Sequence, residues 1–278
     1  MSALAIMTNG GSLRAMSNLS TTTRALNKTI GRLSSGIRIE SAADDAAGLA
    51  VTENMRGQMR GYQQAVRNAN DGISILQTAE SAYQSISDTL IRMRELAVEA
   101  ANDSLSDVER GFLDTEFQDL STEITRISDV TEFNGISLLD GTAGAAGTMT
   151  FQVGTRNSAN DRITVVLEDQ DSTALGVNAS AVDDRTNAQN AIDEIDTALE
   201  SLNTDRSVLG STISSLNTAV ANLATTVENY GASMGQIRDA DIGAESANFA
   251  RQQVLQQAGV AMLSQANTLP NLALRLLG

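Results

Sequence analysis

Apolar residues in the last third of the chain recur at steps that alternate between three and four residues. The series is Ile192, Ile195, Leu199, Leu202, Arg206, Leu209, Ile213, Leu216, Val220, Leu223, Val227, Tyr230, Met234 and Ile237. This heptad spacing, with no proline inside it, predicts a single helix of about 70 Å. A helix of that length needs partner helices to cover its apolar stripe. Arg206 interrupts the stripe, and we interpret it as a residue that sets the register or extends its charge to solvent.

The N-terminal part of the chain supplies helices of the same kind. A first helix carries the same spacing at Met16, Leu19, Thr23, Leu26, Ile30, Leu33 and Ile37. A second is predicted from about Met59 to Ala101, and residues 102–106 form a turn. Ser106 and Glu109 have the spacing of a capping box, so they predict the start of a third helix. With so short a connection, that helix should fold back antiparallel on the second.

The helical period is absent between about residues 131 and 181. Met149, Phe151 and Val153 alternate with polar residues, as do Ile163, Val165 and Leu167, which predicts a β-hairpin. The C-terminal tail is again amphipathic, and we expect Pro270 to end its helix. The fold prediction is therefore mainly α: a long antiparallel helical bundle or coiled coil, made from paired N- and C-terminal arms, with a small β-hairpin region.

Composition narrows the chemistry that this fold can carry. The 278 residues include no His, no Cys and a single Lys, Lys28. The usual zinc, haem and thiol sites and the Ser-His nucleophile pair are thereby excluded, so we expect no catalytic residue, no metal and no cofactor. A net charge of −15 disfavours nucleic acid as a partner. No apolar run is long enough to span a bilayer, so we expect no membrane insertion.

Five stretches resemble the signatures of bacterial flagellins, the subunits of the flagellar filament. They are RLSSGIRIESAADDAAG at 32–48, RNANDGISILQTAE at 67–80, IRMRELAVEAAN at 91–102, FNGISLLDG at 133–141 and RQQVLQQAGVAMLSQAN at 251–267. The resemblance covers roughly residues 1–141 and 185–278. It implies an extracellular, non-enzymatic protein that polymerises with itself, alone or with other flagellins. It further implies unfolded export through the flagellar type III apparatus and contact with an export chaperone, the filament cap and the hook-junction proteins.

The resemblance also implies a division into layers of a filament. Residues 1–44 with 239–278 would form an inner coiled coil, and residues 45–142 with 181–238 the helical bundle of the surrounding tube. Residues 143–180 would be a short exposed segment that contains the β-hairpin. We expect packing between or within subunits at one set of apolar positions: Leu19, Leu26, Ile30, Leu33, Ile37, Leu209, Ile213, Leu216, Leu255, Met262 and Leu263.

One further patch has two interpretations. Arg92 and Leu96, with Glu116 on the following helix, resemble the patch through which many flagellins bind Toll-like receptor 5 of animal hosts. The alternative is that these residues serve helix packing only. Two alternatives to the filament subunit also stand: the protein at the junction of hook and filament, which shares the terminal signatures, and a secreted helical adhesin or immune ligand that acts as a monomer.

Overall fold

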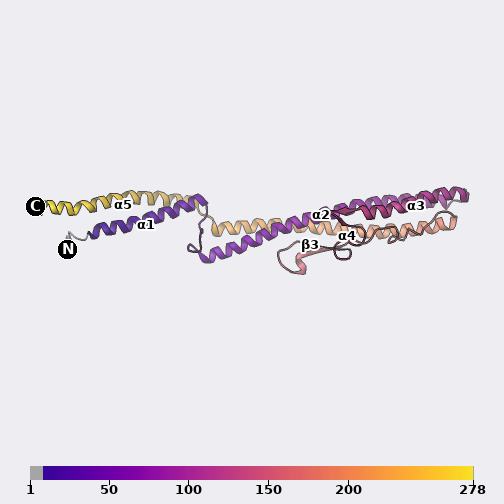
Figure 1. The fold of residues 1–278 in the computed structure, drawn as a ribbon, viewed down its shortest axis with the longest axis horizontal. Coiled ribbons are helices and arrows are strands. Elements are labelled where there is room, and N and C mark those ends of the chain that lie inside the picture. The colour runs from indigo at the N-terminus through magenta and orange to yellow at the C-terminus, as the bar shows by residue number, and fades with distance from the viewer. Residues whose placement is uncertain (1–8, 278) are drawn as a thin grey trace. The chain divides into compact units, whose positions relative to one another are not determined.

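The computed structural model describes the backbone of residues 9–277 and the side chains as far as residue 268, and it is dominated by helices (Figure 1). In chain order these are α1 (Gly10–Ser35), α2 (Ala46–Ala100), α3 (Asp107–Val130), α4 (Arg185–Arg238) and α5 (Ile242–Leu277). Four short strands, β1 (Glu132–Phe133), β2 (Ile136–Ser137), β3 (Thr148–Gln152) and β4 (Arg162–Val166), and one 3₁₀ turn, η1 (Ala159–Asp161), lie between α3 and α4. The mainly α prediction is confirmed.

Two compact units divide the chain. Unit 1 contains residues 1–57 and 230–278, and unit 2 contains residues 58–229. The long helices α2 and α4 therefore each contribute to both units. The boundaries at 57 and 230 divide these helices without any break in their hydrogen-bonded backbone.

Unit 2 is a bundle of α2, α3 and α4 around one continuous apolar core. Tyr83, Leu90, Phe117, Leu209 and Leu216 are all fully buried there. The heptad positions of α4 thus find the partner helices that their spacing requires. Arg206, the exception in that series, donates from Nε and Nη2 to Glu80 Oε1 at 3.0 and 2.8 Å. It lies at the edge of the core, where its charge is paired.

The predicted capping box starts α3. Glu109 N donates to Ser106 Oγ at 3.4 Å, and Ser106 N donates in return to Glu109 Oε2 at 2.8 Å. Two of the orphan amides at the helix N-terminus are thereby satisfied. Arg92 of α2 pairs with Glu116 of α3 at 2.7 Å, as expected for helices that lie side by side in opposite directions (Figure 1).

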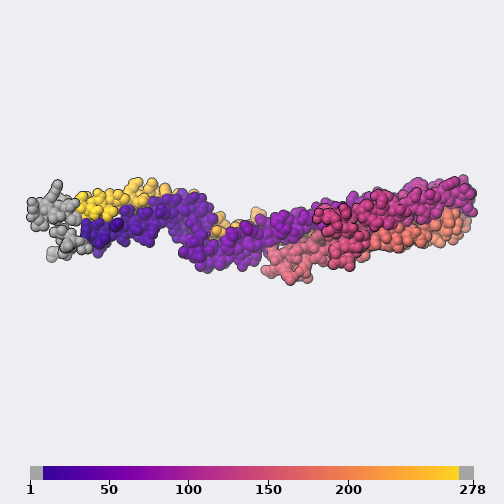
Figure 2. Space-filling view, in the orientation of Figure 1, coloured from indigo at the N-terminus to yellow at the C-terminus, as the bar shows by residue number. Residues whose placement is uncertain are grey.

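Two antiparallel hairpins precede α4. β1 and β2 are joined by Asn134 and Gly135, both with positive φ (52° and 76°), as a tight two-residue turn requires. β3 and β4 pair with Phe151 opposite Ile163, which confirms the predicted hairpin. This second hairpin packs directly on α2, because a Cβ at Gly72 would come within 2.9 Å of the Phe151 ring. The space-filling view shows the hairpin segment against the helices of unit 2 (Figure 2).

Segment 143–180 contributes to the core of unit 2. Its buried side chains include Phe151, Val165, Leu167 and Val177. The segment is too short to enclose a core of its own, so it completes the core of the bundle. Its place on the outside of an assembly stays a prediction.

Unit 1 pairs α1 with α5 in antiparallel orientation. Asn9 caps α1 by accepting from Ser12 N at 3.0 Å, and its Nδ2 donates to Ala266 O at 2.8 Å. At the other end of α1, Arg32 lies 3.8 Å from Glu245. Gly36 ends α1 with φ 71°, the left-handed conformation that a helix C-terminus commonly adopts.

Our expectation for Pro270 was wrong. Helix α5 continues through this position to Leu277. Proline in a helix lacks the amide that donates to the carbonyl four residues earlier, so the helix passes this point with one backbone hydrogen bond fewer.

Candidate assembly surface

Helix α5 places its polar side against α1. The half-buried positions along α5, as far as residue 268, are Glu245, Asn248, Phe249, Gln252, Gln256, Gly259, Leu263 and Ala266. Gly259 lies against Leu19, because a Cβ there would be 3.2 Å from Leu19 Cδ1. The absence of a side chain at Gly259 allows α1 to approach closely. The inner face of α5 is therefore largely polar or small, where a self-sufficient helix pair would present apolar residues.

The apolar side of α5 faces away from α1. Val254 is 64% exposed and Met262 is 66% exposed, and Leu255 and Val260 are exposed as well. Val254, Leu255 and Met262 lie on one face with Ala258 and Ala261, both exposed. We call these five residues the α5 stripe. These five residues make an apolar surface with Arg251 as its charged neighbour, and surfaces of this kind mark interaction sites.

Helix α1 divides the predicted packing residues between two faces. Leu26 is buried, and Leu19 and Leu33 are half-buried. Ile37, which the spacing assigned to this helix, lies beyond its end at Ser35 and is half-buried as well. Ile30 is 45% exposed, and Leu13 and Met16 are exposed too. Leu19, Leu26 and Leu33 thus pack within the chain, while Ile30, like Leu255 and Met262 of α5, remains available. Leu263 is half-buried.

The remaining predicted packing residues, on α4, are enclosed by the chain itself. Leu209 and Leu216 are fully buried in unit 2, and Ile213 is partly buried against the same core. These three residues serve the coiled-coil packing of the subunit. The exposed apolar residues of unit 1 lie instead on α1 and α5.

The loops between the helices of unit 1 are closed by charge pairs. Lys28 Nζ lies 2.5 Å from Asp44 Oδ1, and Arg32 approaches the same carboxylate at 3.8 Å. The hydrogen bond from Lys28 lowers the pKa of Asp44 from 3.8 to about 2. Arg38 N donates to Arg238 O at 2.7 Å, and Ala240 N donates to Gly36 O at 2.9 Å. These contacts join the α1–α2 connection to the junction between α4 and α5.

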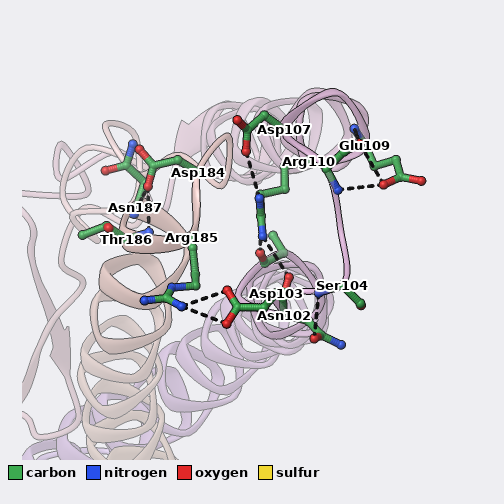
Figure 3. A network of polar contacts seen from close by, with 12 residues as sticks. Asn102, Asp103, Ser104, Asp107, Glu109, Arg110, Asp184, Arg185, Thr186 and Asn187 are labelled. Carbon is green, nitrogen blue, oxygen red and sulfur yellow. Dashed lines mark hydrogen bonds and ion pairs between the residues drawn. The ribbon is translucent and has the colours of Figure 1, made fainter.

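The turn between α2 and α3 holds a buried charge that sequence reasoning missed (Figure 3). Arg110 donates from Nε to Ala100 O and from Nη2 to Asn102 O, at 2.8 and 2.9 Å, and its Nη1 donates to Asp107 at 2.9 Å. It thereby satisfies carbonyls at the C-terminus of α2. Arg185, at the start of α4, donates to both oxygens of Asp103 at 2.8 and 2.9 Å. The only signal in the sequence was the position of Arg110 one turn after the capping serine.

The structure separates the three residues of the predicted receptor patch. Arg92 and Glu116 are exposed and paired at 2.7 Å, and Arg92 also pairs with Glu95 at 3.0 Å. Both carboxylates raise the pKa of Arg92. Leu96 is only 1% exposed and belongs to the core. Its side chain therefore supports the helix from within and is not part of the surface, and receptor binding by Arg92 and Glu116 stays a prediction.

The described residues contain no group of three or more Asp or Glu side chains that could hold a metal ion. Within the same part of the chain, no helix is apolar over a length sufficient to cross a bilayer. Exposed large apolar side chains lie on α1 and α5 in unit 1 and also on α3 in unit 2, where Val108 is 71% exposed and Phe112 is 72% exposed.

Comparisons with known proteins agree with this geometry. Two family models match: the bacterial flagellin N-terminal helical region over residues 6–144 and the bacterial flagellin C-terminal helical region over residues 192–277. A flagellin of Halalkalibacterium halodurans is 40% identical over 250 residues, which are 90% of this chain and 91% of the relative. The flagellar filament core protein flaB2 of Brachyspira hyodysenteriae is 37% identical over 91% of this chain and 92% of its own length.

Solved structures give the same relationship. The crystal structure of Bacillus cereus flagellin is 34% identical, with a TM-score of 0.50 over 56% of this chain and 88% of that chain. The sequence signatures, the helical arms and the matches over nearly the whole length lead to one conclusion. The chain belongs to the bacterial flagellin family.

Proposed function

We propose that this chain is a structural subunit that polymerises into the extracellular filament of a bacterial flagellum and so serves motility. One observation carries the proposal: the α5 stripe is apolar and exposed, while the face of α5 that meets α1 is largely polar or small. Membership of the flagellin family and the flagellar filament core protein among the relatives support it.

The mechanism is burial of apolar surface between copies. The α5 stripe and Leu13, Met16 and Ile30 of α1 are exposed in the described part of unit 1. Covering them with the corresponding helices of other copies removes apolar area from water, which favours association. A contact between two different surfaces of identical copies repeats indefinitely when its rotation does not close, which produces a helical filament.

The layers are part of the proposal. Residues 1–44 with 239–278 would be the inner layer, residues 45–142 with 181–238 the tube, and 143–180 the outward segment. The exposed apolar face of the described residues in unit 1 supports the assignment of the inner layer. The proposed partners are other copies or other flagellins, the type III export apparatus, an export chaperone, the filament cap and the hook-junction proteins. Toll-like receptor 5 is a further proposed partner, through Arg92 and Glu116.

We propose no enzymatic activity. The chain has no His and no Cys, so the commonest nucleophiles and proton-transfer groups are missing. Membership of a structural protein family is consistent with this.

Electron microscopy of the purified chain, after addition of short filament seeds, tests the proposal. We expect long uniform filaments from the unaltered chain and none from a Val254→Asp, Met262→Asp variant, because each aspartate would be desolvated in the apolar contact. Gln253→Asp is the matched control, an exposed position of α5 outside the stripe, and it should polymerise. Persistent monomers of the unaltered chain would contradict the proposal and favour the junction protein or the monomeric ligand.

A further inference from the structure

The guanidinium groups of four arginines of unit 2 have no carboxylate partner among the described residues. They are Arg60, Arg67, Arg156 and Arg162, and all four are exposed. The other six arginines of residues 58–229 each pair with an acid within the chain: Arg92, Arg94, Arg110, Arg126, Arg185 and Arg206. Acidic residues outnumber basic ones in this chain, which has a net charge of −15. A shortage of acids therefore does not explain why these arginines are unpaired.

The contact between α2 and the β3–β4 hairpin brings these four arginines to one area. Asn68 Nδ2, beside Arg67, donates to Gln152 O at 3.1 Å, and Arg162 Nε donates to the Gln152 side chain at 3.2 Å. Two helical turns earlier, Gly61 lies against Thr155, since a Cβ at Gly61 would be 2.7 Å from Thr155 Cγ2. Arg60 and Arg156 are the neighbours of these two residues in sequence. The result is a basic surface at the loop end of the hairpin, where Asp161 accepts from the backbone amide of Arg156 at 3.1 Å.

Two of the arginines lie on one face of α2. Arg60 and Arg67 are seven residues apart, which is two helical turns and about 10 Å along the axis. Arg67 donates from Nε and Nη2 to Gln64 Oε1 at 3.1 and 2.6 Å, so its side chain is held along the helix. The pair therefore presents two cations at a defined spacing.

Helix α4 presents two acids at the same spacing. Asp193 and Glu200 are exposed, seven residues apart, and their carboxylates have no partner among the described residues. Between them, Asp196 is occupied by Arg94 at 2.6 Å. Glu116 and Glu123 of α3 have the same spacing, but Arg92 and Arg126 neutralise them. A shallow hollow beside Glu200, lined in part by Leu199 and Val208, leaves room for a side chain of a partner.

We propose that Arg60 and Arg67 of one copy pair with Glu200 and Asp193 of a neighbouring copy and thereby set the axial offset between copies. The inference rests on the proposed filament function. Copies that repeat along a filament share one direction, and α2 and α4 run in opposite directions within a chain, as the Arg94–Asp196 and Arg206–Glu80 pairs show. An α2–α4 contact between copies is therefore antiparallel, which matches Arg60 with Glu200 and Arg67 with Asp193.

The register also gives the size of the offset. Within a chain, Asp196 lies opposite Arg94 and Arg206 opposite Glu80. In this register Asp193 lies opposite about residue 95 of α2 in its own chain. Pairing it with Arg67 of the next copy shifts that copy by roughly 28 residues, or about 40 Å along the helix at 1.5 Å per residue. The two surfaces are different and neither can pair with itself, so the contact continues from copy to copy and does not close into a dimer. Charge pairs of this kind fix register and accelerate correct encounters.

Charge reversal tests the pairing in the full-length chain. Arg60→Glu with Arg67→Glu should raise the critical concentration for seeded polymerisation by about tenfold or more, because four acids then face one another. Asp193→Arg with Glu200→Arg should do the same. One chain that carries all four changes should polymerise within about threefold of the unaltered critical concentration, since each contact is restored with reversed polarity. Circular dichroism of each monomer should be unchanged, because all four side chains are exposed.

The control for net charge is Asp119→Arg with Glu132→Arg, two exposed acids of α3 and β1. Added to Arg60→Glu and Arg67→Glu, these changes restore the same total charge but should not restore polymerisation. Restoration by this control, failure of the four-residue swap, or an unaltered critical concentration for the arginine variant would each overturn the pairing and leave the filament proposal standing. Persistent monomers of the unaltered chain would overturn both.

Discussion

The two units of this chain use similar helices in opposite ways. In unit 2, α2, α3 and α4 enclose a core in which Leu90, Phe117 and Leu209 are fully buried. In the described part of unit 1, the buried apolar side chains are Leu26 and Ile39 alone, and the α5 stripe is exposed. Unit 2 therefore completes its core within one copy, whereas unit 1 keeps the α5 stripe exposed to solvent.

The largest effect that distinguishes the units should come from truncating one large apolar side chain in each. Phe117→Ala leaves a cavity in the core of unit 2 and should lower the free energy of unfolding by about 3–5 kcal/mol. Met262→Ala removes an exposed side chain and should change monomer stability by less than about 0.5 kcal/mol while weakening polymerisation. Urea unfolding of the monomers measures both. A comparable loss of stability in the Met262 variant would show that α5 is already covered in the monomer.

The next largest effect on stability should come from Arg110, the buried arginine at the turn between α2 and α3. Arg110→Ala leaves Ala100 O and Asn102 O without their donor, so the free energy of unfolding should fall by about 1–3 kcal/mol. Arg126→Ala removes an exposed pair with Glu123 on the same helix and should cost about 0.5 kcal/mol or less. Thermal unfolding of the two variants provides the comparison. Equal losses would contradict a special role for Arg110.

Two glycines test whether the β3–β4 hairpin is held against α2. At Gly72 a Cβ would lie 2.9–3.1 Å from three ring atoms of Phe151, so Gly72→Ala should destabilise unit 2 by about 1 kcal/mol after the gain in helix propensity. At Gly111 of α3 a Cβ meets nothing within 4 Å, and Gly111→Ala should stabilise the monomer by up to about 1 kcal/mol. Opposite signs in urea unfolding are expected. A stabilising Gly72→Ala would mean that the hairpin is not held against α2.

The smallest effect is a difference in proton binding between two aspartates. The hydrogen bond from Lys28 lowers the pKa of Asp44 to about 2, so its contribution to stability is present above about pH 4 and lost as the pH falls towards 2. Burial in unit 2, aided by the charge of Glu168, raises the pKa of Asp205, so stability falls as the pH rises through that value. Carboxyl ¹³C NMR titration should give a pKa for Asp44 below its ordinary value and a pKa for Asp205 above it.

The matched variants for that titration are at Lys28. Lys28→Met should return the pKa of Asp44 towards 3.8, while Lys28→Arg should keep it low. An unchanged pKa in Lys28→Met would show that the backbone amides of residues 40 and 41, which also donate to this carboxylate, are sufficient by themselves.

Much of the fold followed from local patterns. The heptad series predicted α4, the Ser106–Glu109 spacing predicted the start of α3, and the alternation around Phe151 predicted the β3–β4 hairpin. These features depend on residues within a few turns of one another, so the sequence contains them directly.

The candidate surface was harder to predict, because it depends on which face meets which partner. The spacing of Leu255 and Met262 marks an apolar side of α5 but does not tell whether α1 or another copy covers it, and it did not separate them from Leu263, which faces α1. Leu96 and Arg110 show the same limit: the leucine is buried and the arginine satisfies the end of a helix, and neither role is visible without the neighbouring helix. Tertiary contacts decided each case.

The most direct test of the central claim uses the absence of cysteine from the chain. Met262→Cys places one thiol on the α5 stripe, and Asn160→Cys places one at the exposed tip of the β3–β4 hairpin. Both thiols should react rapidly with a maleimide in the monomer. After polymerisation, labelling at position 262 should slow by about tenfold or more while position 160 remains reactive. Equal labelling of position 262 in monomer and filament would contradict the claim that unit 1 is completed by other copies.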